Sequence, residues 1–215
     1  VAFASLVMGW HIMLPKQFME FADSLIAVSL FYSNIHFWQI TADYFAQSTD
    51  MMPLLHSWSL SVEEQFYIAF PLFLFTVRAL GVQMKIILLL LLTFGSFALT
   101  QLDLSNDPNA AFYLTPTRAW ELGVGAIIAL IPANTFLKTS STLKEIVAFI
   151  GLINVLLSFT LFDEDMRHPG LITLAPVLGT AFIIAFADQR SFVGRLLSWK
   201  PLVGTGLISY SLYLW

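Results

Sequence analysis

Long apolar runs, separated by short polar stretches, follow one another along almost the whole chain. A helix that crosses a bilayer needs about 20 mostly apolar residues, within a range of roughly 17–25. Eight runs approach this length, and the first is stopped by Pro15. They cover residues 1–14, 21–38, 60–77, 86–102, 119–133, 146–162, 169–187 and 202–215. Because lipid offers the backbone no hydrogen-bond partners, the runs predict an all-α fold, a polytopic transmembrane helical bundle with about eight spans, the first and last truncated.

The composition agrees with a lipid environment. Hydrophobic residues make up 58% of the chain and charged residues 11%, whereas a typical soluble domain carries about 25% charged residues. The net charge of −4 is small, and the absence of a basic stripe argues against a nucleic-acid partner. The chain has no cysteine, which excludes disulfides and thiolate chemistry. We interpret residues 1–215 as one membrane domain without an internal repeat.

The two sides of this predicted bundle differ in positive charge. When alternate connections are counted, one side holds eight basic residues and the other holds only Arg118 and Arg167. The eight are Lys16, Arg78, Lys85, Lys138, Lys144, Arg190, Arg195 and Lys200. Loops rich in Lys and Arg stay in the cytoplasm, so we expect the side with eight basic residues to be cytoplasmic. The acidic residues 163–165 then lie outside.

The strongest cluster of polar residues, HSWSLSVEEQFY, lies at the outer end of the third run and begins at His56. A charge at the bilayer centre costs about 2.5–3.5 kcal/mol, so such residues usually face a cavity or a partner. Ser61 and Glu64 fit a capping box, in which a serine and a glutamate close the start of a helix. That interpretation gives Glu64 a structural role.

Glu63 and Tyr67 lie four residues apart and therefore share one face of the predicted helix. Ser59 extends this face if the helix starts a turn earlier. A carboxylate, a phenol and a hydroxyl together can orient a general base or bind a sugar hydroxyl. The alternative is that Glu63 is hydrated at the level of the lipid headgroups and has no function.

A second polar cluster, TPTRAWELGVG, opens the fifth run. Thr115 followed by Pro116 is typical of an N-cap with proline at the first helical position. Arg118 and Glu121 are three residues apart and can neutralise each other. Alternatively, the planar guanidinium of Arg118 holds an anion such as a phosphate.

The remaining motifs are structural or absent. Gly123 and Gly125 predict close packing of a neighbouring helix. No histidines or carboxylates have metal-ligand spacing such as HExxH, so no metal site is predicted. No glycine-rich phosphate loop and no GxSxG nucleophile motif occur either.

The segment LLHSWSLSVEEQFYIAFPLFLF, residues 54–75, closely resembles the signature of the acyltransferase-3 family. These are integral-membrane bacterial O-acyltransferases, which include O-antigen acetylases. Other segments resemble the family in the same order, namely FADSLIAVSLFYSNIHFW, TPTRAWELGVGAIIAL, HPGLITLAPVLGTAFIIAF and ISYSLYLW. The resemblance implies a bundle of about ten spans of the usual length. The chain would then be a single membrane acyltransferase domain that lacks the first helix and the C-terminal end.

The resemblance implies a reaction and a location. Family members transfer an acyl group, usually acetyl, from cytoplasmic acyl-CoA to a hydroxyl of a cell-surface glycan or lipid-linked sugar. Acyl-CoA is thus expected as a co-substrate, no permanently bound cofactor is expected, and the partners are membrane lipid and the acceptor. The expected location is the bacterial cytoplasmic (inner) membrane, with residues 54–75 starting at the extracytoplasmic face.

The resemblance also implies roles for individual residues. Ser59, Glu63 and Tyr67 fall on the family's SxxxExxxY pattern, which gives them catalytic roles, with Glu63 orienting a histidine. The expected substrate-binding residues are Arg118, Glu121, His56, Trp58 and Glu64. The family's catalytic histidine, which follows a basic residue in its first helix, has no counterpart here, so the chain by itself is expected to be inactive.

A transporter or flippase of a lipid-linked or small substrate is the alternative function. Such proteins are usually built from inverted repeats with paired broken helices. No second half of that kind is visible in the sequence, which favours the acyltransferase.

Overall fold

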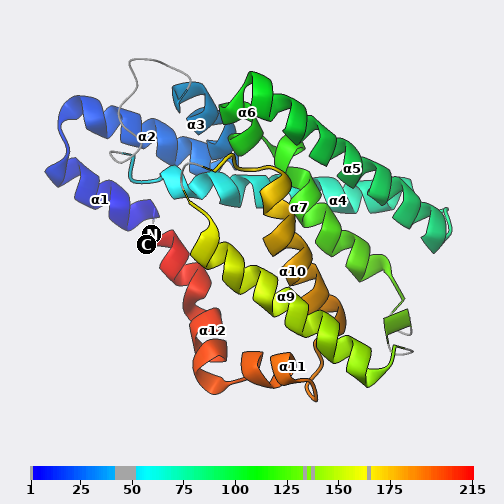
Figure 1. Cartoon of the computed structure of the whole chain (residues 1–215). Helices are drawn as coiled ribbons and strands as arrows, with labels where there is room; N and C mark the ends of the chain where they lie inside the picture. Colours follow the sequence, from blue (N-terminus) through cyan, green and yellow to red (C-terminus); the bar gives the residue numbers. More distant parts are fainter. Residues whose placement is uncertain (1, 42–51, 133–134, 137–138, 164–165) are drawn as a thin grey trace.

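The computed structural model describes residues 2–41, 52–132, 135–136, 139–163 and 166–215, and the regular structure in these ranges is helical (Figure 1). The α-helices are α1 (Ala2–Ile12), α2 (Pro15–Ser29), α3 (Ser33–Thr41), α4 (Trp58–Thr76), α5 (Val82–Asn106), α6 (Pro108–Tyr113), α7 (Thr115–Leu130), α9 (Ser141–Leu161), α10 (Leu174–Phe186), α11 (Phe192–Leu197) and α12 (Lys200–Leu214). Two short 3-10 helices, η2 (Leu55–Ser57) and η3 (Leu171–Thr173), precede α4 and α10.

The all-α class predicted from the sequence is confirmed, whereas the number of membrane spans is confirmed only in part. Among the described residues, α5 with 25 residues and α9 with 21 are long and apolar enough to cross a membrane. Two further apolar helical segments, 3–12 and 171–186, are shorter. The described residues therefore support a helical membrane protein with two clear spans, and the other six predicted spans are not confirmed.

The predicted span over residues 21–38 is wrong, because the chain breaks there into α2 and α3. Phe31 lies in the break with a φ of 57°, which is uncommon for a bulky residue. Two side chains of α4 supply the hydrogen bonds that the break requires. Gln65 Nε2 donates to the Phe31 carbonyl at 2.8 Å, and the Ser33 N–H donates to Ser61 Oγ at 3.1 Å. The polar residues within this run do not show which other helix they contact, so the sequence does not reveal the break.

Two helix pairs form the body of the molecule, α5 with α7 and α9 with α10 (Figure 1). The second pair packs backbone against backbone at two glycines. A β-carbon added to Gly151 would lie 2.5 Å from the Gly179 carbonyl oxygen, and one added to Gly179 would lie 2.8 Å from that of Gly151. Small residues allow such an approach between membrane helices, so this contact depends on both glycines.

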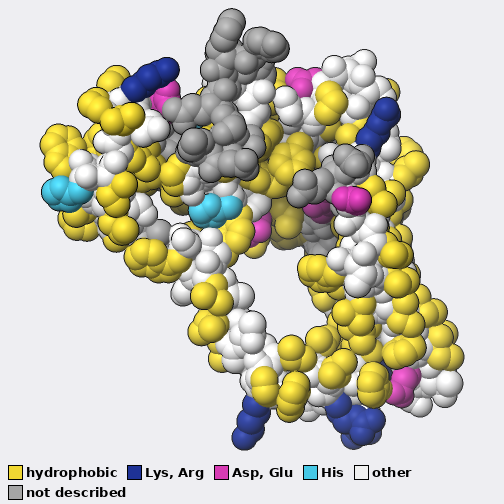
Figure 2. All heavy atoms as spheres, turned by 60° about the vertical axis from the view of Figure 1, so that its left-hand side comes forward, with side chains coloured by type: hydrophobic (Ala, Val, Ile, Leu, Met, Phe, Trp, Pro, Cys, Tyr) yellow, Lys and Arg dark blue, Asp and Glu magenta, His cyan; other side chains and the backbone are white. Residues whose placement is uncertain are grey.

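A small aromatic core lies near one end of the α5–α7 pair and supports the polar residues described below. Its buried members are Phe21, Phe37, Leu54 and Tyr113, which come from α2, α3, the segment before η2, and α6. Elsewhere large apolar side chains face outward, and hydrophobic atoms cover much of the surface in Figure 2. A protein whose solvent is lipid is expected to expose such side chains.

Candidate functional site

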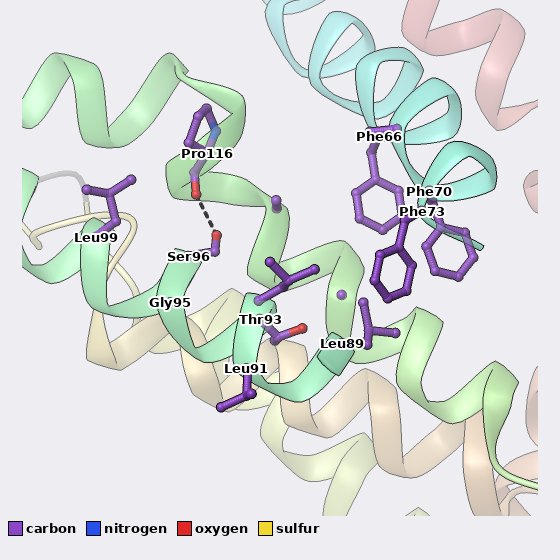
Figure 3. Close-up of a pocket in the computed structure, with 14 residues that line it drawn as sticks. Phe66, Phe70, Phe73, Leu89, Leu91, Thr93, Gly95, Ser96, Leu99 and Pro116 are labelled. Atoms are coloured by element: carbon purple, nitrogen blue, oxygen red, sulfur yellow. Dashed lines mark hydrogen bonds between the residues drawn. The ribbon is translucent and has the colours of Figure 1, made fainter. Parts of the chain in front are cut away.

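The first turn of α7 is held by two hydroxyl groups of α5. Ser96 Oγ donates to the Pro116 carbonyl at 2.6 Å and accepts the Trp120 N–H at 3.0 Å, so it bridges a carbonyl and an amide one turn apart (Figure 3). Thr100 Oγ1 donates to the Thr117 carbonyl. These contacts fix the start of the helix that carries Arg118.

Arg118 and Glu121 form an ion pair with 2.9 Å between Nη1 and Oε1. Their side chains are only 16% and 24% exposed. The guanidinium carbon lies 5.1 Å from the ring centre of Trp58 on α4 and 5.5 Å from that of Phe112 on α6. Both distances suit a cation–π interaction. The predicted neutralisation of Arg118 by Glu121 is confirmed, and the pair lies against two aromatic rings.

The Arg118 guanidinium has N–H donors that the ion pair with Glu121 does not use. An arginine side chain carries five N–H groups. Besides the contact with Glu121, Arg118 forms no hydrogen bond to any residue in the described ranges. The side chain can therefore bind a further oxygen ligand, such as a phosphate or a developing oxyanion, without losing its carboxylate partner.

An amide network ties α3, α4 and the start of α7 together beside this pair. The fully buried Asn34 donates from Nδ2 to the Tyr113 carbonyl at 3.1 Å and to Thr115 Oγ1 at 3.2 Å. Gln65 Nε2 donates to Asn34 Oδ1 at 2.9 Å, and Thr115 Oγ1 donates to Gln65 Oε1. The prediction of Thr115 as an N-cap is wrong, because Leu114 takes that position and the threonine hydroxyl serves the network instead.

The predicted capping box of Ser61 and Glu64 is also wrong. Helix α4 begins at Trp58, with Ser57 in the N-cap position and without a side-chain cap. Ser61 lies inside the helix, where its hydroxyl is 2.7 Å from that of Ser33 on α3. The Ser61 hydroxyl therefore bonds to Ser33 on α3 and does not provide the cap at the start of α4 that the sequence pattern predicts.

His56 and Ser59 meet the last turn of α12. The Tyr213 hydroxyl donates to the His56 carbonyl and forms a hydrogen bond with Ser59 Oγ. The His56 and Tyr213 rings lie edge to face, with 5.4 Å between their centres. The structure thus brings together the start of α4 and the end of α12, which are far apart in the sequence.

Three of the predicted site residues remain apart from these contacts. Glu63, Glu64 and Tyr67 form no hydrogen bond or ion pair with another described residue. Glu63 is half-buried, whereas Tyr67 is 56% exposed. The described part of the chain also contains no group of three histidine or carboxylate side chains that could hold a metal ion.

The residues that organise the site are mostly polar side chains inside apolar runs. Ser33, Asn34, Gln65, Ser96 and Thr100 carry the contacts between helices, and none of them was a predicted site residue. A polar group among apolar residues in a membrane helix usually hydrogen-bonds to a neighbouring helix. That signal is present in the sequence, but it does not say which polar residues are partners.

Fold and site together define a helical membrane protein with a half-buried arginine–glutamate pair, framed by aromatic rings, at the junction of α4, α6 and α7. The profile of a known family, described as "Acyltransferase domain", matches residues 3–215. The chain therefore belongs to the acyltransferase-3 family of enzymes.

Individual relatives agree with this assignment. YrhL of Bacillus subtilis, to which peptidoglycan O-acetyltransferase activity is attributed, is 31% identical over 96% of this chain and 34% of its own length. The O-acetyltransferase OatA of Staphylococcus aureus is 31% identical over 94% of this chain and 35% of its own. The peptidoglycan O-acetyltransferase OatA of Listeria monocytogenes is 28% identical over 94% and 34%. The chain thus spans about a third of the length of these relatives. No solved structure matches it.

Proposed function

We propose that the protein to which this chain belongs transfers an acetyl group from acetyl-CoA to a hydroxyl of a cell-surface glycan, with peptidoglycan as the acceptor. Membership of the acyltransferase-3 family supports the reaction type. The names of the relatives favour peptidoglycan among the cell-surface glycans and lipid-linked sugars that the sequence resemblance implies. The donor follows from the family resemblance.

The observation that carries the proposal is the partly shielded guanidinium of Arg118 with unused donors. Acyl transfer forms a bond between the acceptor oxygen and the thioester carbonyl carbon and breaks the bond from that carbon to the CoA sulfur. The acceptor hydroxyl gives up its proton, and CoA leaves as the thiol. Between these two events the carbonyl oxygen carries negative charge. A positioned cation or N–H donor stabilises that charge, and more strongly where water is excluded. Trp58 and Phe112 exclude water from one side of the guanidinium, and Glu121 fixes its orientation.

The remaining predicted residues receive supporting roles in this proposal. Glu63 is half-buried one turn after Ser59, so its carboxylate is free to orient a general base that takes the proton from the acceptor hydroxyl. Ser59 and Tyr67 flank Glu63 on α4 and are assigned to the acceptor side.

The test uses the whole protein in membrane vesicles with labelled acetyl-CoA and detects O-acetylated muropeptides. Arg118→Lys keeps the charge but loses the planar donors, and Arg118→Met loses both. Loss of one such donor typically slows an acyl-transfer step about 100-fold to 1,000-fold, so we expect both variants to fall in that range. Arg167→Met removes the other arginine of the predicted outer side and is the matched control.

Two outcomes would contradict the proposal. Normal transfer by Arg118→Met at normal protein levels would remove Arg118 from the site. Label that appears in another glycan and never in peptidoglycan would refute the acceptor but not the reaction.

A further inference from the structure

An apolar groove of about 430 Å³ lies between α4, α5 and α7 (Figure 3). Phe66, Phe70 and Phe73 of α4 form one wall, and Leu89 and Leu92 of α5 belong to the other. The volume lies within the range of about 300–1,000 Å³ typical of small-molecule sites. The polar side chains in the lining are Thr93 and Ser96, and the Ser96 hydroxyl is occupied by the backbone of α7. The groove therefore suits a hydrocarbon ligand.

The length of the groove matches one leaflet of a bilayer. Its lining residues on α5 run from Leu89 to Leu99, which corresponds to roughly 15 Å at about 1.5 Å of rise per residue. The hydrocarbon core of a bilayer is about 30 Å thick, so one leaflet contributes about half of that. A single acyl chain fits this length, whereas a membrane-spanning helix needs twice as much.

Two cations lie beyond one end of the groove. Lys85 precedes the lining residue Leu89 by one turn of α5. Arg78 follows the end of α4, and its guanidinium carbon lies 4.2 Å from the ring centre of Phe75. Neither cation forms an ion pair with a carboxylate in the described part of the chain. The charge distribution predicts that this end faces the cytoplasm, where membranes present anionic lipids.

We propose that the groove binds one acyl chain of an anionic phospholipid of the cytoplasmic leaflet, with the headgroup phosphate beside Arg78 and Lys85. The apolar lining suits an acyl chain, and the length of the groove matches one leaflet. The two cations, which have no carboxylate partner in the described part of the chain, favour a negatively charged headgroup. Arg118 does not line this groove, and the lipid proposal does not depend on the acyl-transfer proposal.

Gly95 offers a way to fill the groove without breaking the fold. It lines the groove, and a β-carbon placed on it meets no atom within 4 Å. Gly95→Leu therefore occupies the space of the acyl chain. Gly125 on α7 is equally open but does not line the groove, so Gly125→Leu is the matched control.

The experiment measures the lipid retained by the whole protein in native mass spectrometry after reconstitution with phosphatidylglycerol or phosphatidylcholine of the same chains. We expect the wild type and Gly125→Leu to retain phosphatidylglycerol preferentially, and Gly95→Leu to lose most of it. Arg78→Gln with Lys85→Gln changes only the groove mouth and is expected to abolish the preference between the two lipids while chain binding persists.

The proposal fails if Gly95→Leu retains as much lipid as Gly125→Leu. It also fails if the wild type holds both lipids equally. This second test does not depend on whether the Gly95 variant folds. A change from one oligomeric state to another in Gly95→Leu, without loss of lipid, would instead identify the groove as a contact between copies of the chain.

Discussion

At the scale of the residue, the Gln65 side chain forms three hydrogen bonds near the site. It donates to the Phe31 carbonyl and to Asn34 Oδ1 and accepts from Thr115. Without Gln65, the Phe31 carbonyl and Asn34 Oδ1 would lose this partner in an apolar setting, which costs free energy. One amide thus stabilises the break between α2 and α3 and the entry to α7 at once.

Replacing Gln65 with leucine is expected to destabilise the protein. The Phe31 carbonyl and Asn34 Oδ1 lose a donor, and Asn34 is fully buried, where an unsatisfied group costs about 1–3 kcal/mol. Thermal unfolding in detergent should show the loss. Gln83 is exposed on α5 and forms no hydrogen bond with a described residue, so Gln83→Leu serves as the control. Equal unfolding temperatures for the two variants would refute the role of the network.

The Asp188 carboxylate, in the turn before α11, gives a residue-scale prediction about pH. The backbone N–H groups of Arg190 and Ser191 donate to it at 2.8 and 2.9 Å and lower its pKa below the ordinary value of 3.8. A group whose pKa is lowered by folding stabilises the fold above its unfolded pKa. That contribution is lost as the pH falls through the lower, folded pKa.

A carboxyl NMR titration should therefore place the Asp188 midpoint below that of the same sequence in a short peptide. Asp188→Asn, which cannot titrate, should remove the resonance and identify it. A midpoint at or above the peptide value would show that the two backbone hydrogen bonds do not form in solution.

At the scale of the element, the helical glycines are of two kinds. Some are required because a neighbouring helix packs closely against them, and others have no neighbour at that position. Gly123 and Gly125 were predicted alike from the sequence. A β-carbon on Gly123 would lie 2.5 Å from Thr93 Oγ1 on α5, whereas one on Gly125 meets nothing within 4 Å. Close packing is confirmed for the first and wrong for the second, because only one of the two faces α5.

The α9–α10 contact gives the corresponding prediction. Gly151→Ala and Gly179→Ala each place a methyl group against a backbone carbonyl, which cannot rotate away. Overpacking of this kind costs about 1–3 kcal/mol. Gly125→Ala, in open space, gains helix propensity of up to about 1 kcal/mol. Unfolding of the three variants measured side by side should give opposite signs, and a neutral Gly151→Ala would refute the tight contact.

The hydrophobic runs in the sequence predict the structure most reliably here, and the local capping patterns predict it least reliably. The runs correctly predict where α4, α5, α7 and α9 lie, because burial in lipid requires a continuous apolar helix. The caps at Ser61 and Thr115 fail because these hydroxyls bond to other helices. Pairing of Arg118 with Glu121 was predictable from three-residue spacing, whereas the aromatic frame around it arises from three helices that only the fold brings together.

At the scale of the whole molecule, the predicted site and the lipid groove share the first turn of α7. Pro116 and Ser96 line the groove, and the Ser96 hydroxyl holds the turn that carries Arg118. An acyl chain in the groove would therefore pack against the support of the site. A lipid bound in the groove and a substrate bound at Arg118 are both expected to stabilise the first turn of α7.

The orientation of the molecule in the membrane follows from its charge distribution and is open to a direct test. The chain contains no cysteine, so a single introduced thiol reports one position. Gly81, between α4 and α5, is exposed and has open space around it, and Asn109 is exposed on α6. We expect a membrane-impermeant maleimide to label Asn109→Cys in intact cells and Gly81→Cys only after permeabilisation.

Labelling after denaturation controls for expression of both variants, and the chain without an added cysteine controls for background. Asn109 lies on α6, close to Arg118, and Gly81 lies between Arg78 and Lys85. The opposite labelling pattern would therefore place Arg118 and α6 on the cytoplasmic side and Arg78 and Lys85 outside. The acceptor glycan could then not reach Arg118 from the cell surface, and the cations beside the groove would face the leaflet poorer in anionic lipid. One topology experiment thus constrains both proposals, because the site and the groove mouth lie at opposite ends of α5 and α7.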